Sequence, residues 1–431
     1  MDDVRARREP RTFLSQVLEV TPLFPCRFCG SPVRHTVVDL GMSPLCESFL
    51  SPEQLDQMEP FYPLHAYVCE ECFLVQVKEY VAPEGIFTEY AYFSSYSQSW
   101  LRHAKVYVDM ITTRLGLDAR SHVVELGSND GYLLQNFVTR GIPALGVEPA
   151  ANVAVAARKK GVPTVVLLFG EETARGLLAQ GKQADLIIGN NVLAQVPDLN
   201  DFVKGMKLLL KPSGTITMEF PHLLRLMEEN QFDTIYHEHF SYFSVITALR
   251  IFDAHGLRLY DVEELPTHGG SLRIYVGHAD DSGKVPSERV HNLAAREEAA
   301  GLRRLSRYTQ FTEQVHETKR RLLEFLIGVK RQGKSVVGYG APGKGNTLLN
   351  YCAIRTDFID YTVDRNPYKH GKFLPGTHIP IHAPERINET RPDYVLILPW
   401  NLREEIMEQL AEIRSWGGQF VVPIPDVKVY A

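Results

Sequence analysis

The chain has 431 residues, of which 44% are hydrophobic and 23% are charged, as is usual for globular proteins. Its formal net charge is −6 with no long run of like charge, which argues against a nucleic-acid partner. No apolar run approaches the roughly 18 residues that span a bilayer, and MDDVRARREP contains no apolar stretch that could act as a signal peptide. We therefore expect a soluble, cytoplasmic protein without a membrane partner.

Three blocks of different character follow one another along the chain, and we expect each to be a domain. Residues 1–80 are rich in cysteine and proline, with short apolar strand candidates at 64–68 and 73–77. Residues 81–285 alternate apolar runs with helical stretches. Residues 286–431 begin with a charged helical stretch, which we expect to form a pair of connecting helices, and continue with a second strand–helix alternation.

Two CxxC pairs lie in the first block, Cys26-Arg-Phe-Cys29 and Cys69-Glu-Glu-Cys72. Each pair presents two thiolates from a tight turn, and together they supply the four sulfurs of a tetrahedral zinc site. Four protein ligands leave no coordination position for water, so we expect a structural Zn²⁺. The spacing between the pairs is longer than in common zinc ribbons, and paired buried thiols without a metal stay an alternative.

Four apolar runs in the second block are predicted to be buried strands. The segments between them are long enough for crossover helices, which predicts a parallel sheet and an α/β, Rossmann-like core. The runs are VVEL (123–126), ALGVE (144–148), DLIIGN (185–190) and GTITMEF (214–220).

The first of these strands leads into the glycine-rich turn of the sequence ELGSNDG (125–131). The second strand ends at Glu148, 21 residues after Gly127, where a carboxylate can accept both ribose hydroxyls of an adenosine ligand. Since ligands bind at the carboxyl ends of parallel strands, we expect a cofactor here. The candidate cofactor residues are Glu125, Gly127, Asn129, Gly131, Glu148 and Asn190.

The spacing of the glycines in this turn distinguishes two classes of cofactor. The dinucleotide fingerprint G-x-G-x-x-G places a helix N-terminus on a pyrophosphate, whereas this turn reads G-x-x-x-G. S-adenosylmethionine has a positively charged sulfonium and no phosphate, so it suits an acidic, amide-rich turn better. The turn also resembles the first motif of class I methyltransferases. NAD and a core without a ligand stay alternatives.

The segment DTIYHEHFSYFS (233–244) follows the fourth strand and is unusually rich in polar side chains. His237, Glu238 and His239 could act as general bases. His237 and His239 could also hold a metal, because they point the same way if the segment is extended. The zincin pattern H-E-x-x-H is absent. We favour acid–base chemistry, with a metal site or a polar core as the alternatives.

The third block contains another strand–turn–helix start, GYGAPGKGNT (338–347). Its backbone donors and Lys344 could bind a diphosphate. Asp364 ends the next predicted strand, FIDYTVD (358–364), where an acid can reach a ribose; YVLILPW (394–400) is a further strand candidate. A domain that serves only as a lid, and an NAD site, stay alternatives.

Both CxxC pairs, ELGSNDG, YHEH and GYGAPGKGNTLLN occur in the order that resembles bacterial nucleotide-sugar C-methyltransferases, and the resemblance covers nearly the whole chain. That family joins a small zinc-binding N-terminal domain, a class I methyltransferase core and a C-terminal Rossmann-like domain. The resemblance implies methylation of a nucleotide-linked 4-keto deoxysugar, with dTDP as the nucleotide and C3 as the carbon, in branched deoxysugar biosynthesis. Another carbon such as C5, an oxygen or nitrogen acceptor, and an NAD-dependent sugar oxidoreductase stay alternatives.

The resemblance also implies roles for individual residues. His239 would be the base, assisted by Glu238, and whether Glu238 or His239 takes the proton stays open. Tyr236 would stabilise the oxyanion on the ketone oxygen, and Tyr90 would be a second active-site tyrosine, although its neighbours Tyr92, Phe93 and Tyr96 compete for that match. The substrate would contact His237, Gly340, Lys344 and Asn346. A monomer is compatible with the sequence, which leaves the oligomeric state open.

Overall fold

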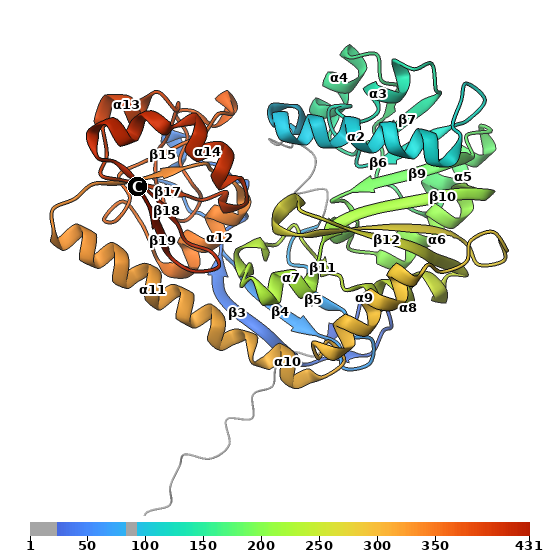
Figure 1. The fold of residues 1–431 in the computed structure, drawn as a ribbon, viewed down its shortest axis with the longest axis horizontal. Coiled ribbons are helices and arrows are strands. Elements are labelled where there is room, and N and C mark those ends of the chain that lie inside the picture. Colours follow the sequence, from blue (N-terminus) through green and yellow to red (C-terminus); the bar gives the residue numbers. More distant parts are fainter. Residues whose placement is uncertain (1–23, 83–92) are drawn as a thin grey trace, which may run out of the picture.

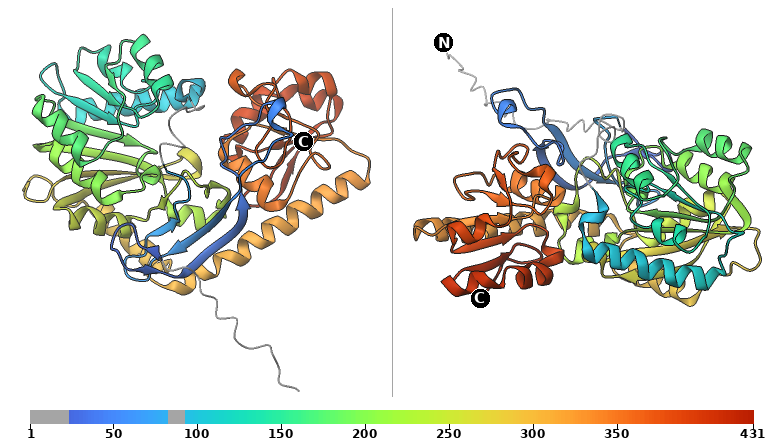
Figure 2. Two further views of the ribbon diagram at one scale, coloured as in Figure 1. Left: turned by 180° about the vertical axis from the view of Figure 1, so that it is seen from behind. Right: turned by 90° about the horizontal axis from the view of Figure 1, so that it is seen from above.

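The computed structural model describes residues 24–82 and 93–431. A seven-stranded sheet and a six-stranded sheet form two lobes, which are joined by a four-stranded sheet and by the long helix α11 (Phe311–Arg331) (Figure 1). Strand β3 (His35–Ser43) of the four-stranded sheet runs beside this helix from one lobe towards the other (Figure 2). Among the described residues, no helix is long and apolar enough to cross a membrane.

The seven-stranded sheet has the strand order β12-β13-β10-β9-β6-β7-β8. Neighbouring strands from β10 to β8 pair in parallel, and β13 pairs antiparallel with both β10 and β12. The four predicted strands of the core are present, with ends that differ by a few residues. Their bounds are β6 (Val123–Leu126), β7 (Ala144–Val147), β8 (Thr164–Val165), β9 (Ala184–Asn190), β10 (Leu210–Pro221), β12 (Leu257–Leu265) and β13 (Ser271–His278).

Helices cover both faces of this sheet (Figure 1), which is why its strands are apolar at almost every position. Val123 and Ile188 pack towards one face, whereas Val124 and Ile187 pack towards the other, as the alternation of side chains along a strand requires. One face carries α2 (Gln98–Leu115), α3 (Gln135–Val138) and α4 (Ala151–Lys159); the other carries α5 (Glu171–Ala179), α6 (Leu199–Leu209) and α8 (Val245–Ala254).

The N-terminal region forms a pair of short strands, β1 (Phe24–Pro25) and β2 (Pro32–Val33), and the four-stranded sheet β11-β5-β4-β3. Strands β4 (Tyr62–Val68) and β5 (Val75–Val77) correspond to the predicted strands there. The fourth strand, β11 (Ser241–Tyr242), comes from the segment that follows YHEH and pairs antiparallel with β5. This pairing fixes the YHEH segment against the N-terminal sheet.

The six-stranded C-terminal sheet has the order β16-β15-β14-β17-β18-β19 and is parallel except for β19. Together with the core it confirms the predicted α/β fold. The observed strands are shorter here than predicted: only two residues of 358–364 pair with neighbouring strands. The elements are β14 (Val336–Tyr339), α12 (Gly343–Cys352), β15 (Thr362–Val363), β16 (Ile381–His382), β17 (Tyr394–Ile397), β18 (Gln419–Val422) and β19 (Lys428–Tyr430).

Residues 285–332 form three helices rather than the expected pair: α9 (Glu288–Ala299), α10 (Leu305–Thr309) and α11. Helix α9 packs on α8 and β12, whereas α10 and α11 pack on β3. The connecting segment therefore packs first on the core and then on the N-terminal sheet, and it ends at the C-terminal lobe.

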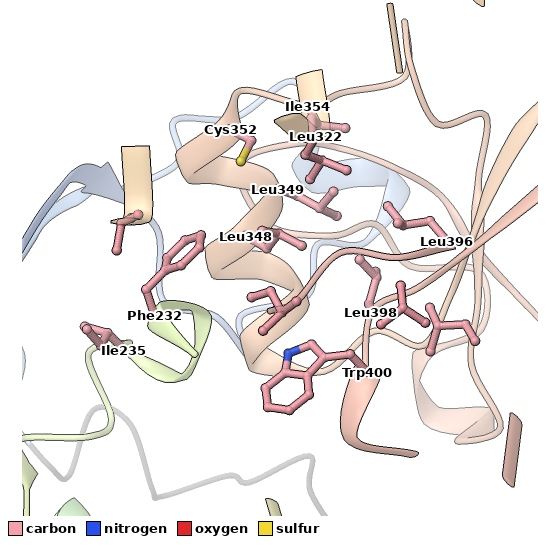
Figure 3. Packing of buried hydrophobic residues seen from close by; sticks show 14 of the residues in the cluster. Phe232, Ile235, Leu322, Leu348, Leu349, Cys352, Ile354, Leu396, Leu398 and Trp400 are labelled. Carbon is pink, nitrogen blue, oxygen red and sulfur yellow. The ribbon is translucent and has the colours of Figure 1, made fainter. Parts of the chain in front are cut away.

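The segment just before the YHEH turn is anchored in the C-terminal lobe. Figure 3 shows Phe232 facing Leu348 of α12, with Trp400 at the N-terminal end of that helix. The hydroxyl of Thr347 donates to the carbonyl of Ile235 at 3.0 Å. The YHEH turn thus has one side fixed to α12 and the other to β5.

Candidate active site

The first of two cavities that concern the predicted site has a volume of about 490 Å³ and lies at the carboxyl ends of β6, β7 and β9. We call it the core cavity. Gly127, Asn129, Glu148 and Asn190 line it. It also has an aromatic and aliphatic lining that suits the adenine of an adenosine ligand, made by Trp100, Tyr132, Leu167, Leu168, Phe169, Val192 and Phe202.

The carboxylate of Glu148 is held in place by two backbone donors. Its Oε2 accepts the N–H of Asn129 at 2.8 Å, and its Oε1 accepts the N–H of Ala150 at 2.9 Å. Burial raises the pKa of Glu148, and these two N–H groups oppose that shift. Gly127 is needed in the turn because its φ is +64° and a Cβ would lie 3.1 Å from Val192. The carboxylate of Glu148 thus helps to fix the backbone of the turn.

Two of the predicted cofactor residues do not line the core cavity. Glu125 lies inside β6 between β7 and β9, is fully buried, and burial raises its pKa well above the usual value. Gly131 has a φ of +75°, and a Cβ there would lie 3.0 Å from Val162. Neither residue faces the core cavity, whose lining lies at the carboxyl ends of the strands.

The second cavity, of about 340 Å³, lies where the core, the N-terminal region and the C-terminal lobe meet. We call it the interdomain cavity. Tyr236, Glu238 and His239 line it from the core. The C-terminal lobe contributes Gly340, Lys344, Asp364, Arg365 and Lys369, and the N-terminal region contributes Glu47.

The YHEH segment is a turn and not an extended strand, because the N–H of His239 donates to the carbonyl of Tyr236 at 2.9 Å. His237 and His239 therefore point in different directions. His237 contacts the carbonyl of Pro63 at 3.2 Å and packs against Tyr62, away from the interdomain cavity. The expectation that His237 contacts the substrate has no support in this placement, and the pair cannot form the metal site that an extended segment would allow.

The position of one proton on His239 follows from its hydrogen bond. Nδ1 lies 3.0 Å from the carbonyl oxygen of Thr234, and a carbonyl can only accept, so Nδ1 carries the hydrogen. Nε2 is then the basic atom of the neutral ring. Burial lowers the pKa of His239 to about 4, which keeps the imidazole neutral at pH 7. Burial raises the pKa of Tyr236 well above its usual value, so its phenol stays a donor.

The predicted substrate residues of the C-terminal lobe divide between two roles. Gly340 (φ +89°) and Lys344 line the interdomain cavity, where Lys344 donates to Asn401 at 2.8 Å and lies over the ring of Trp400. Burial lowers the pKa of Lys344 to about 8. Asn346 is outside the cavity lining and instead donates to the carbonyl of Cys46 at 2.6 Å. Asn346 therefore joins α12 to the N-terminal region.

The core cavity and the interdomain cavity share Asn191 and Gln195 in their linings. A ligand in one cavity can therefore meet a ligand in the other at this point. Tyr90 lies outside the described residues, so its proposed role stays a prediction.

Comparison with known proteins identifies the three regions. The chain matches family models of a zinc binding domain over residues 26–87, a methyltransferase domain over 100–262 and a C-methyltransferase C-terminal domain over 266–425. It is 36% identical to the C-methyltransferase NovU of Streptomyces niveus over 410 residues, which cover 95% of this chain and 97% of that protein. This chain belongs to the C-methyltransferase family.

Two further likenesses are weaker. A ubiquinone biosynthesis O-methyltransferase of Chelativorans is 24% identical over 152 residues, which cover 33% of this chain and 58% of that protein. The crystal structure of a SAM-dependent methyltransferase from Anabaena variabilis has a TM-score of 0.34 and 14% identity, and covers 40% of this chain and 83% of that chain.

The protein is thus a C-methyltransferase that uses S-adenosylmethionine and carries a zinc-binding N-terminal domain. The core cavity fits that methyl donor, because Glu148 can accept ribose hydroxyls and the buried Nδ2 of Asn190 lacks a hydrogen-bond partner within residues 24–82 and 93–431. Carboxylates line the core cavity, whereas no lysine, arginine or histidine among the described residues does. A sulfonium cation suits such a lining.

The zinc-binding domain of this C-methyltransferase gathers its four CxxC sulfurs, which all lie within 4.8 Å of one another. The Sγ atoms of Cys26 and Cys72 are 3.6 Å apart and those of Cys29 and Cys69 are 3.5 Å apart, too far for disulfides. Sulfurs at 2.3 Å from one Zn²⁺ would be about 3.8 Å apart in a tetrahedron. The cysteines therefore fit a structural zinc ion.

Two N-terminal residues at the interdomain cavity belong to no recognisable sequence motif. The thiol of Cys46 donates to Glu238 at 3.5 Å, and Glu47 lies 3.6 Å from the ammonium of Lys369. Burial raises the pKa of Cys46 well above its usual value, so it stays a thiol. Cys46 and Glu47 are close to the CxxC pairs in sequence but belong to the active site in space, because β3 carries the chain from the zinc end towards α12.

Proposed function

We propose that this C-methyltransferase acts on a nucleotide-linked 4-keto deoxysugar, with dTDP as the nucleotide and C3 as the methylated carbon. The observation that carries the proposal is the meeting of the two cavities at Asn191 and Gln195, with Glu238 and His239 on the interdomain side. A methyl donor in the core cavity and a sugar in the interdomain cavity would face each other there, and the general base would lie beside the sugar.

The lining of the interdomain cavity supports a nucleotide diphosphate as the anionic part of the substrate. Lys344, Arg365 and Lys369 all line it, and α12 begins there at Gly343. Backbone N–H groups at a helix N-terminus and lysine side chains are suitable partners for phosphate oxygens. Asp364 lines the same cavity, at the end of the next strand, where it can accept a ribose hydroxyl.

The chemistry follows from the residues on the core side. Nε2 of His239 accepts the proton from the carbon next to the ketone, and the electron pair of that C–H bond becomes an enolate. The phenol of Tyr236 donates to the oxyanion on the ketone oxygen. When bound, S-adenosylmethionine would supply an electrophilic methyl group to the enolate carbon, and its sulfur would keep the electron pair of the broken S–CH₃ bond.

Glu238 supports His239 or replaces it as the base, since both line the cavity and the thiol of Cys46 orients the Glu238 carboxylate. Burial of the Tyr236 phenol strengthens its interaction with the developing oxyanion.

Product NMR tests the proposal. The enzyme is incubated with S-adenosylmethionine and a dTDP-4-keto-6-deoxysugar, and the product should show a new C–CH₃ group at C3 and loss of the proton on that carbon. Solvent deuterium should exchange into the substrate at C3 without the methyl donor, and His239→Ala should abolish this exchange. A methyl group on oxygen or nitrogen, or at C5, would contradict the proposal.

A further inference from the structure

The residue at the junction of the two cavities, Asn191, has an unusual backbone. It follows β9 directly and has a φ of +57°, in the left-handed region that favours glycine. Its N–H donates to the carbonyl of Glu219 at 2.7 Å, which holds the residue in this conformation. Residues kept in such strained conformations cluster at functional sites.

The side chain of Asn191 is held at one end and unpaired at the other. Its Nδ2 lies 3.1 Å from Nε2 of His268. An amide nitrogen can only donate, so Nε2 of His268 accepts and the neutral ring carries its hydrogen on Nδ1. The Oδ1 atom of Asn191 is buried and has no hydrogen-bond partner in the described part of the chain. A buried carbonyl oxygen without a partner is costly unless a ligand compensates for it.

His268 is itself fixed by the loop between β12 and β13. Its φ is +54°, and the hydroxyl of the preceding Thr267 donates to Glu219 at 2.9 Å. The ring of Trp100 packs against His268 with 5.2 Å between the ring centroids. Glu219 also accepts from His103 at 2.9 Å and from Arg273. The backbone carbonyl of Glu219 thus holds Asn191, and its carboxylate holds Thr267. This one buried residue therefore helps to position both Asn191 and His268.

We propose that Asn191 binds the sulfonium end of the methyl donor through Oδ1 and that His268 is a positioning residue that keeps this oxygen turned towards the methyl group. A carbonyl oxygen is attracted to a cationic sulfonium and can accept weak hydrogen bonds from its polarised methyl C–H groups. The reversed amide would direct an NH₂ group at the cation and is therefore disfavoured. The proposal depends on the core cavity being the donor site and not on the identity of the acceptor.

The test compares S-adenosylmethionine with S-adenosylhomocysteine, which has neither the methyl group nor the positive charge. The main variant is Asn191→Gly, because glycine accepts the positive φ and removes the side chain. Calorimetry on the full chain should show that this variant weakens binding of S-adenosylmethionine about two- to fivefold, while binding of S-adenosylhomocysteine is unchanged. Asn191→Asp keeps an oxygen there and should bind S-adenosylmethionine at least as tightly as the natural protein.

Two further variants test the positioning role of His268. His268→Ala should produce the same selective loss, whereas His268→Gln, which can still accept from Nδ2 of Asn191, should restore part of it. The methyl proton resonance of bound [methyl-¹³C]S-adenosylmethionine is a second readout. It should move upfield in Asn191→Gly and in His268→Ala, because C–H···O contacts deshield the proton.

The proposal would be overturned if Asn191→Gly lowered the affinity for the two ligands equally, or lowered the affinity for neither. An unmoved methyl resonance would also overturn it. Glu148→Gln tests separately whether the core cavity is the donor site. If it is, this variant should lower the affinity for both S-adenosylmethionine and S-adenosylhomocysteine. If Glu148→Gln changes neither affinity, the assignment of the core cavity fails, and with it the proposal for Asn191.

Discussion

Two strand–turn–helix units of this chain share a geometry but differ in the charge around it. In the core, Glu148 follows β7 and accepts the N–H of Asn129 in the turn after β6 at 2.8 Å. In the C-terminal lobe, Asp364 follows β15 and accepts the N–H of Ala341 in the turn after β14, also at 2.8 Å. Each unit therefore places an acid from the second strand beneath the turn of the first.

The side chains around the two turns are different. The core cavity has carboxylates and, among the described residues, no cationic side chain in its lining, whereas the interdomain cavity adds Lys344, Arg365 and Lys369 to its carboxylates. The first unit suits a cationic sulfonium ligand and the second suits a phosphate. The common fold provides backbone donors and an acid, and the neighbouring side chains decide the charge of the ligand.

The largest effect should come from the turn between the two units, where we expect chemistry rather than binding. His239→Ala should lower kcat about 100- to 10,000-fold, because it removes the general base. Both ligands should still bind as in the natural protein when measured by calorimetry. His237→Gln is the matched control on the same turn: it should lower the melting temperature, because His237 packs on the N-terminal sheet, and change turnover much less. Similar turnover losses in the two variants would contradict the assignment.

A smaller effect should follow when the acid of the first unit is neutralised. Glu148→Gln should weaken binding of S-adenosylmethionine about 10- to 100-fold, because charge-assisted hydrogen bonds to the ribose hydroxyls are lost. Binding of the nucleotide sugar should not change. Titration calorimetry with each ligand measures both effects, and Glu172→Gln, on the exposed surface of α5, is the control. A loss confined to the nucleotide sugar would reverse the roles of the two units.

The corresponding change in the second unit should be weaker still. Lys344→Met should reduce affinity for the nucleotide sugar about tenfold and leave S-adenosylmethionine binding intact. Because Lys344 acts through its charge, the loss should shrink as ionic strength rises. Lys428→Met, at an exposed position on β19, controls for general charge effects. If both lysine variants bind the nucleotide sugar equally, the phosphate lies elsewhere.

The smallest effect concerns stability and pH. Burial lowers the pKa of both His239 and His268 to about 4. Between pH 4 and about 6.5 the unfolded chain therefore binds more protons at these histidines than the folded chain, so their contribution to the free energy of unfolding falls as the pH falls. Buried carboxylates with raised pKa values, such as Glu148, act in the opposite direction.

A comparison of variants isolates the histidine contribution. Urea unfolding at pH 7 and pH 5 should show that His268→Gln loses less stability on acidification than the natural protein does. A larger loss in the variant than in the natural protein would contradict the pKa shift of His268.

Much of this architecture could be predicted from local sequence. The strands β6, β7, β9 and β10 appear as apolar runs because both faces of the sheet are covered. Strand β15 was predicted too long, because only Thr362 and Val363 pair with neighbours and the apolar residues before them pack without a ladder. The turn at residues 236–239 could not be recognised, since its shape depends on contacts with β4, β5 and α12.

Contacts between distant parts of the chain account for the rest of the site. Cys46 and Glu47 reach Glu238 and Lys369 only because β3 and α11 join the lobes. His268 faces Asn191 because β12 and β13 return along β10. Neither pair has a local motif, so composition and spacing could not have found them.

A crystal structure with S-adenosylhomocysteine and the nucleotide sugar would test the central claim most directly. We predict the sulfur at the junction beside Asn191, the ribose on Glu148, and the carbon to be methylated within about 4 Å of Nε2 of His239 or of the Glu238 carboxylate. A nucleotide in the core cavity, or a sugar whose reactive carbon lies away from both Glu238 and His239, would contradict the account.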